Sequence, residues 1–521
     1  MDDELREASS MVVSGNKVVA ISENNKPVGE FAEEIDLEGK TVVPGFNDSH
    51  MHLLGVGESM ETINLNSCKS RKDVVETIEE YIDKNNPEPG SWLEGRGWDQ
   101  NRFNDKTMPG RELLDRVKGD YPIYLKRVCG HISTANSMAL KKAGIKENTS
   151  APSGGNIDIN KEGQPTGILR ENAMKLVEQH IPQPDIADFK RWILSAGREL
   201  VKNGITSVQT DDFGSKDRFE KIYPLYKDLA DKEELPLRIN LQTRIEELSE
   251  FKEVVENEGI KTGDGNSWLK VGPCKILADG SLGGRTAALC EPYSDQEETK
   301  GTLIYTPEEL RKFIKYADSA GFQLAIHGIG DRVIELIVDL YREELEKKRI
   351  KNTRPRIIHA QITNQELIDQ MAELGIGADI QPIFINSDLH IAEDRLGERV
   401  EGTYAWNTMW DKGINLAGGS DAPVETYSPL KGIYSAVTRK DLNGYPEKGW
   451  RSEEGLSIDQ ALSIYTKDSA YHTFEEDVKG RLAEGMLADF VVLDQDITAI
   501  DSENIKDLEI AATYIGGKKV Y

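Results

Sequence analysis

Eight short apolar segments constrain the fold of this chain more than any other feature of its sequence. They lie at 41–48, 204–211, 237–244, 268–279, 322–328, 355–362, 375–382 and 414–421. Segments with a helical period of apolar residues fall between them, as at 307–321 and 364–375. Alternating β and α units predict a parallel sheet, and eight strands suit a closed TIM-type barrel. We therefore expect an α/β chain built on a (β/α)8 barrel.

The two ends of the chain carry short β signals instead. MVVSGNKVVAIS places Gly15 and Asn16 between two apolar runs, and ATYIGGKKVY places Gly516 and Gly517 at a turn. Two isolated hairpins would each be marginally stable in water. We expect them to pair into one composite β-sandwich domain, formed by residues 1–45 plus 475–521, which leaves 46–474 for the barrel.

One interval is too long for a connection between two barrel strands. Residues from about 60 to 185 separate the first predicted strand from the second and mix β and helical signals. We expect an inserted subdomain after the first barrel strand. Because loops at this edge of a barrel flank the active site, the insert should help to shape the substrate pocket.

Charge narrows the range of partners. The 91 acidic and 64 basic residues give a formal net charge of -27, so the chain lacks the basic excess that neutralises nucleic-acid phosphates.

No apolar run approaches the roughly 18 residues that a membrane helix requires, and MDDELREASS lacks the basic-then-apolar order of a signal peptide. We expect a cytoplasmic protein with no nucleic-acid or membrane partner. Its acidic surface reflects either ordinary solvation or adaptation to salt. A homodimer is a working assumption, because the sequence does not reveal the oligomeric state.

Residue types that bind metals stand at the ends of five predicted strands. His50 and His52 have the i, i+2 spacing that puts both imidazoles on one side of a strand. A lone histidine at such a position is more often structural than a ligand. Four of the eight histidines fall at these points, however, on the face where barrel enzymes carry their catalysis, and this favours a metal centre. The full candidate set is His50, His52, Lys275, His327, His359 and Asp421.

Lys275, in GPCKILADG, allows two interpretations. It is either a lysine whose charged end reaches solvent or an inward-facing amine at the barrel mouth. An inward amine would be desolvated and would favour its neutral form. A neutral amine can react with carbon dioxide to form a carbamate, whose two oxygens can bridge two cations. The residues alone do not decide between the two.

A series of ordered motifs resembles the amidohydrolase superfamily. The motifs are PGFNDSHMH, GRGWDQ, RVCGHISTANSMAL, PTGILRENA, GITSVQTDD, KILADGSLGGRTAAL, IHGIGDR, IIHAQ, GGSDAPVETYSPL and GRLAEGMLADFVVLD. Within it, the sequence looks most like the third amidohydrolase family, which includes N-substituted formamide deformylase-like proteins. The resemblance extends from about residue 10 to 521, and it also implies the composite β domain.

The resemblance assigns a role to each candidate ligand. It implies that His50 and His52 bind the more buried of two metal ions and that His327 and His359 bind the second. It implies that Lys275 is carboxylated and bridges both ions, and that Asp421 binds metal and shuttles the catalytic proton. Some relatives hold a single metal. The ligand types suit zinc first, and a metal-bound hydroxide would then attack the substrate carbonyl.

Four further residues are candidates for the pocket. The resemblance places His131 near the substrate carbonyl as a catalytic residue, although a buried structural histidine is the alternative. Trp98 forms either an apolar pocket wall or part of the core. Asp279 and Arg285 follow Lys275 closely and could orient ligands or line the pocket.

Three functions remain open on this evidence. The first is hydrolysis of a non-peptide carbon–nitrogen bond in a small-molecule amide, an N-formyl or N-acyl group, or a cyclic amide. The second is hydrolytic deamination of a ring amine, which needs one metal and no Lys275. The third is a binding protein without catalysis on the same fold, which occupation of all six ligand positions disfavours.

Overall fold

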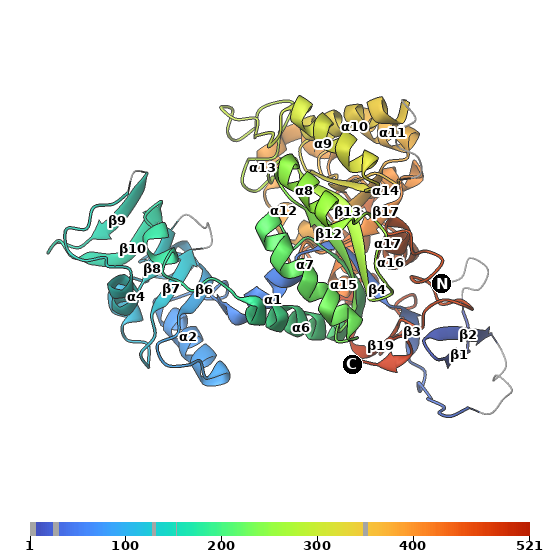
Figure 1. The fold of residues 1–521 in the computed structure, drawn as a ribbon, viewed down its shortest axis with the longest axis horizontal. Coiled ribbons are helices and arrows are strands. Elements are labelled where there is room, and N and C mark those ends of the chain that lie inside the picture. The colour runs from blue at the N-terminus through green and yellow to red at the C-terminus, as the bar shows by residue number, and fades with distance from the viewer. Residues whose placement is uncertain (1–6, 24–30, 128–131, 153, 347–352) are drawn as a thin grey trace. The chain divides into compact units, whose positions relative to one another are not determined.

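The computed structural model describes residues 7–23, 31–127, 132–152, 154–346 and 353–521. Its central feature is a sheet of eight parallel strands in the order β17-β16-β15-β14-β13-β12-β11-β4 (Figure 1). The sheet nearly closes, since the backbone N–H of Asp421, just after β17, donates to the carbonyl of His50 in β4 at 2.8 Å. This confirms the predicted barrel. The strands are β4 (Phe46–Met51), β11 (Ile205–Thr210), β12 (Arg238–Arg244), β13 (Leu269–Leu277), β14 (Leu324–Gly328), β15 (Arg356–His359), β16 (Gly377–Ile380) and β17 (Leu416–Gly418).

Helices lie around the outside of this sheet (Figure 1). The helix α9 (Pro307–Ser319) shows why they form: Thr306 and Glu309 make a capping box at its start, and Leu310, Phe313 and Ile314 form a buried apolar stripe. Burying each such side chain contributes about 1.5–3 kcal/mol. The other main helices of this part are α6 (Ile186–Lys202), α7 (Lys216–Asp231), α8 (Leu248–Glu258), α10 (Asp331–Glu346), α11 (Gln365–Leu374), α14 (Trp406–Asp411), α15 (Pro429–Thr438), α16 (Ile458–Ile464) and α17 (Lys467–His472). Across the described residues, none of the helices combines the length and apolarity needed to cross a bilayer.

The first predicted strand, 41–48, is two strands in two different sheets. β3 (Thr41–Pro44) pairs with a C-terminal strand, whereas β4 begins at Phe46 and enters the barrel. Gly45 separates them, and a Cβ atom at this position would lie 2.2 Å from Thr206 Oγ1. The close approach therefore requires glycine, and Pro44 cannot donate a backbone hydrogen bond that would continue the strand pairing.

The two chain ends meet in a composite β domain. β3 pairs antiparallel with β18 (Phe490–Leu493), which pairs with β19 (Ile510–Ile515) and, through it, β20 (Lys518–Lys519). β1 (Ser10–Ser14) and β2 (Lys17–Ser22) form the predicted hairpin. Val18 of the hairpin is fully buried in the same apolar cluster as Phe490 and Tyr514, so both pieces share one core.

A buried ion pair ties the composite domain to the barrel. Arg238 at the start of β12 donates to both carboxylate oxygens of Asp489, through Nε at 2.6 Å and Nη2 at 3.0 Å. Each side chain is only 4% exposed. Asp489 also accepts the N–H of Gly516 at 2.7 Å, so its charge is satisfied from both directions.

Residues Gly57–Phe189 form a second compact unit with its own sheet. The strand order is β5-β6-β7-β8-β10-β9, in which β5 to β7 run parallel and the remaining pairs are antiparallel. The helix α2 (Arg71–Asn85) packs Val74, Ile78 and Ile82 into the core of this insert. The strands are β5 (Ile63–Asn64), β6 (Leu93–Trp98), β7 (Ile123–Arg127), β8 (Ile132–Ala135), β9 (Gly155–Ile159) and β10 (Pro165–Glu171).

Candidate metal centre

The barrel strands deliver the six candidate ligands to one end of the sheet. His50 lies in β4 and His52 directly after it, while Lys275 lies in β13. His327 lies in β14, His359 ends β15, and Asp421 follows β17 by three residues. Parallel strands align their carboxyl ends, which is why residues up to 371 positions apart in the chain approach each other here.

Four of these side chains are linked by short contacts around Asp421. Asp421 Oδ1 lies 3.3 Å from His50 Nε2 and 3.1 Å from His52 Nε2. The ring centroids of His50 and His359 are 5.6 Å apart. Ligand atoms of His50, His359 and Asp421 all lie within 4.8 Å of one another, and all three residues are buried. This spacing is compatible with metal binding by these side chains.

His327 extends the cluster on the side of His359. Their ring centroids are 4.4 Å apart. His327 Nε2 lies 3.0 Å from the carbonyl oxygen of Gly280 and 3.2 Å from Asp279 Oδ1. Because a carbonyl oxygen only accepts, His327 carries its proton on Nε2 and leaves Nδ1 as the atom available to a metal.

In His52 the roles of the two ring nitrogens are reversed relative to His327. Its Nδ1 lies 2.7 Å from the backbone carbonyl of Asp211, so Nδ1 donates and Nε2 faces Asp421. Asp211 is itself held by Arg244, whose Nε lies 2.9 Å from Asp211 Oδ1. The other two histidines turn their outer nitrogens to glutamines: His50 Nδ1 lies 2.9 Å from Gln242 Oε1, and His359 Nδ1 lies 2.6 Å from Gln381 Oε1.

The electrostatics of the cluster favour an ionised Asp421. Burial alone would raise the pKa of this carboxyl, but the nearby imidazole of His50 and the hydrogen bond with His52 hold the pKa well below its usual range. Burial and the nearby Lys275 lower the pKa of His50 to about 4. Burial also disfavours a charged His52, but its hydrogen bond with Asp421 raises the pKa of His52 to about 9. A cation here would take the place of the proton that Asp421 and His52 share.

Lys275 is a buried amine that has no hydrogen-bond or ion-pair partner in the described part of the chain. Its side chain is 2% exposed, and burial lowers its pKa to about 8 against the opposing charges of Asp211 and Asp421. Among the described residues, none forms a hydrogen bond or an ion pair with Lys275 Nζ. A buried, weakly basic and unpaired amine beside several metal-ligand side chains fits the chemistry of a carboxylated lysine, whose added oxygens would satisfy the site.

Asp48 is a structural support that the sequence analysis missed. Its Oδ1 accepts the backbone N–H of His50 at 3.1 Å and of Ser420 at 3.2 Å, which joins the two ligand-bearing segments at the closure of the barrel. Burial raises the pKa of Asp48 to about 7 despite these bonds. Its position two residues before His50 in PGFNDSHMH was the available signal.

The structure describes three of the four pocket candidates predicted from the sequence, and two of them, Asp279 and Arg285, follow β13. Asp279 is fully buried, and its carboxylate accepts the N–H groups of Ala288, Ile329 and Gly330, so it organises the loops beside His327. Arg285 bonds Asp295 through Nε at 3.1 Å and Nη2 at 2.8 Å.

The other two candidates belong to the insert. Trp98 is fully buried in the apolar core of the insert and donates its indole N–H to the carbonyl of Leu125 at 3.2 Å. This agrees with the core alternative that the sequence left open. His131 lies outside the described residues.

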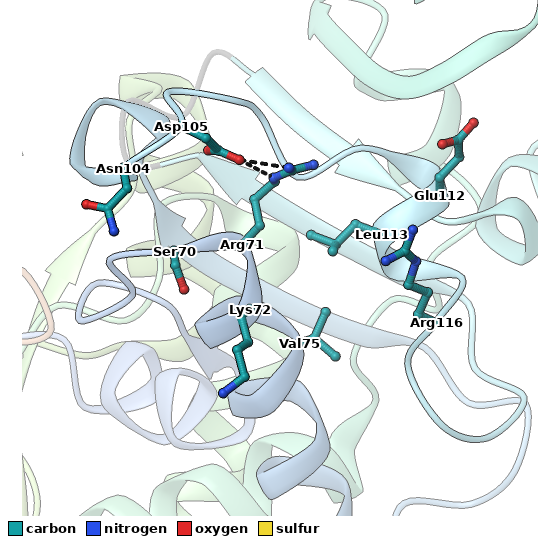
Figure 2. A pocket seen from close by; sticks show the side chains of 9 residues that line it. All are labelled: Ser70, Arg71, Lys72, Val75, Asn104, Asp105, Glu112, Leu113 and Arg116. Carbon is teal, nitrogen blue, oxygen red and sulfur yellow. Dashed lines mark hydrogen bonds and ion pairs between the residues drawn. The ribbon is translucent and has the colours of Figure 1, made fainter.

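The insert also contains a cavity of about 550 Å³ that involves none of the six candidate ligands. Figure 2 shows Arg71 turned toward Asp105, with Nη2 2.7 Å from Oδ2. Lys72 and Arg116 line the same cavity, together with Glu112. Its charges are mixed, and Arg71 is already paired with Asp105.

A barrel whose strand ends gather histidines and a carboxylate defines a class of metal-dependent hydrolases. Comparison with known proteins gives the same class. The model of the Amidohydrolase family matches residues 33–521, and the chain belongs to this family. It is therefore a hydrolase.

Individual relatives cover nearly the whole chain. YtcJ of Bacillus subtilis (strain 168) is 36% identical over 494 residues, which are 94% of this chain and 90% of that protein. The N-substituted formamide deformylase of Arthrobacter pascens is 26% identical over 523 residues, or 98% and 94% of the two chains. A crystal structure of an uncharacterized metal-dependent hydrolase from Pyrococcus furiosus superposes with a TM-score of 0.73 at 27% identity, covering 94% of this chain and 95% of the other.

Proposed function

We propose that this chain hydrolyses a non-peptide carbon–nitrogen bond in an amide, an N-formyl or N-acyl group, or a cyclic amide. The observation that carries the proposal is the convergence of His50, His359 and Asp421 to within 4.8 Å, with the unpaired amine of Lys275 nearby. The name of the Arthrobacter pascens relative, N-substituted formamide deformylase, supports this substrate class.

The residues present fit two divalent metal ions, with zinc as the first choice. We assign His50 and His52 to one ion and His327 and His359 to the other, and Asp421 and a carboxylated Lys275 would supply oxygen ligands. Formation of the carbamate joins the neutral Lys275 nitrogen to the carbon of carbon dioxide and releases one proton to water. Bound metal would supply Lewis acidity toward the substrate carbonyl and lower the pKa of water.

The chain itself supplies the proton transfer. Asp421 is buried, and its low pKa keeps it ionised near neutral pH, so its carboxylate is unprotonated and available as the proton acceptor. The leaving nitrogen must gain a proton to depart as an amine, and in this proposal Asp421 delivers it. The imidazoles are held by hydrogen bonds from behind, which keeps the cluster ready without reorganisation.

A hydrolysis screen with metal analysis tests this proposal. Purified protein is analysed for bound transition metals, labelled with ¹³C-bicarbonate for carbon NMR, and assayed on N-formyl amines, N-acyl amines, cyclic amides and ring amines. We expect about two metal ions per chain, a carbamate signal, and release of an amine together with a carboxylic acid. Release of ammonia from ring amines alone, or no bound metal, would overturn the proposal.

A matched pair of variants identifies the site. His50→Ala should lose metal and activity, whereas His180→Ala replaces an exposed histidine of the insert and should lose neither. Equal activity in both variants would refute the assignment.

A further inference from the structure

Two buried glutamines stand behind the two most buried imidazoles of the cluster. The side-chain oxygen Oε1 of Gln242 lies 2.9 Å from Nδ1 of His50. The side-chain oxygen Oε1 of Gln381 lies 2.6 Å from Nδ1 of His359. Gln242 is fully buried and Gln381 is 3% exposed. Histidines that bind metals usually donate their outer N–H to a carboxylate, a backbone carbonyl or water, so a pair of side-chain amides is a distinctive choice.

The orientation of each amide follows from its second hydrogen bond. Gln242 Nε2 donates to the carbonyl of Ser49 at 3.1 Å, and Gln381 Nε2 donates to the carbonyl of Asp379 at 3.1 Å. A carbonyl accepts only, so each amide must turn its NH₂ group to the backbone and its oxygen to the imidazole. A flipped amide would lose its bond to the backbone and place its own oxygen against the backbone carbonyl oxygen, so that two acceptors would face each other.

The amide orientation in turn fixes the imidazole. An amide oxygen accepts only, so the nitrogen that faces it must carry the proton. Both rings are therefore protonated at Nδ1 and present an unprotonated Nε2 to the cluster, where His50 Nε2 lies 3.3 Å from Asp421 Oδ1. The opposite tautomer would set two lone pairs against each other in a site closed to water.

We propose that Gln242 and Gln381 are positioning residues that lock the metal-binding tautomer of His50 and His359 and thereby set the metal affinity of the centre. This inference rests on the metal centre of the proposed function. Because the two acceptors are neutral, they fix the tautomer without adding negative charge to a buried cluster. Loss of a partner of this kind reduces metal affinity by about 10–100-fold.

Metal affinity of the full-length, metal-free protein tests the proposal. Zinc and cobalt(II) are titrated against a chromophoric chelator in the wild type, Gln242→Met and Gln381→Met, which keep the side-chain length but remove the acceptor. We expect each variant to bind about 10–100-fold more weakly than the wild type, with an altered cobalt(II) absorption spectrum. Gln242→Glu and Gln381→Glu keep an acceptor oxygen for the imidazole but lose the donor to the backbone carbonyl, so they should bind metal more tightly than the methionine variants.

Gln323 provides the matched control. It is 3% exposed, and its Nε2 donates to the carbonyls of Arg354 and His472, both at 2.9 Å, without touching a candidate ligand. Gln323→Met should therefore destabilise the fold but leave metal affinity unchanged. An equal loss of affinity in Gln323→Met, or no loss in the other two methionine variants, would overturn the inference while leaving the metal centre itself in place.

A second measurement does not depend on any variant that may not fold. Long-range ¹H–¹⁵N spectra of the metal-free wild type, labelled with ¹⁵N-histidine, report which ring nitrogen carries the proton. Protonation of His50 and His359 at Nδ1 supports the proposal, and protonation at Nε2 contradicts it. A wild type that binds neither zinc nor cobalt(II) would instead refute the proposed function, so the two failures are distinguishable.

Discussion

Replacing Lys275 by methionine should stabilise the metal-free protein while removing its function. Lys275 is 2% exposed and has no partner at Nζ among the described residues, and burial lowers its pKa from 10.5 to about 8. One pKa unit corresponds to about 1.4 kcal/mol, so holding this charge inside the barrel costs about 3 kcal/mol at neutral pH. Methionine has a similar length and no charge, and it removes that cost.

The sign of the pH dependence follows from the same two pKa values. Below pH 8 the amine is protonated in both folded and unfolded chains, so the full cost is present. Between pH 8 and pH 10.5 the folded chain loses its proton while the unfolded chain keeps it, so the wild type gains stability as pH rises. The advantage of Lys275→Met should therefore be largest at pH 7 and shrink toward pH 10.

Thermal unfolding of the chelator-treated proteins measures this difference. For a unit of about 390 residues, an unfolding entropy of about 2.1 cal/mol/K per residue converts 3 kcal/mol into a rise in Tm of about 4 °C. Lys479→Met is the contrast: Lys479 is also buried, but its Nζ bonds Ser207 Oγ at 2.7 Å and Glu475 at 2.8 Å, so its loss should lower Tm. A lower Tm for Lys275→Met, or a difference that does not change with pH, would refute the reasoning.

Three further outcomes are expected. Asp421→Asn should reduce kcat by at least about 100-fold, because general acid–base catalysis contributes about 10²–10⁴-fold, while circular dichroism remains that of the wild type. Arg238→Met should lower the free energy of unfolding in urea by about 3–5 kcal/mol, because it leaves Asp489 buried and charged; a loss below 1 kcal/mol would contradict this account. Dialysis against a chelator should abolish hydrolysis, and added zinc should restore it in the wild type but not in His50→Ala; activity that survives chelation would exclude a metal-dependent reaction.

The barrel could be predicted because its signals are local. Each strand is a short buried run, and each helix has a 3.6-residue apolar period, so the alternation was visible without long-range information. The split of 41–48 into β3 and β4 was not, because it depends on Thr206 approaching Gly45 from a strand about 160 residues away. A continuous apolar run does not show that its two halves belong to different sheets.

The candidate metal ligands could also be predicted from local sequence, but the residues that hydrogen-bond to them could not. Scarce histidines at strand ends stand out in a sequence. Gln242 and Gln381 also lie near the ends of predicted strands, but glutamine is common and its role depends on which ring it faces. Trp98 shows the converse, since a tryptophan in a distinctive motif proved to fill the core of the insert.

Crystals grown with zinc and measured at the zinc absorption edge test the central claim most directly. The account predicts two anomalous peaks, one beside His50 and His52 and one beside His327 and His359, with density for a carbamate on Lys275 between them. Peaks elsewhere on the molecule, or no peak among these side chains, would contradict it.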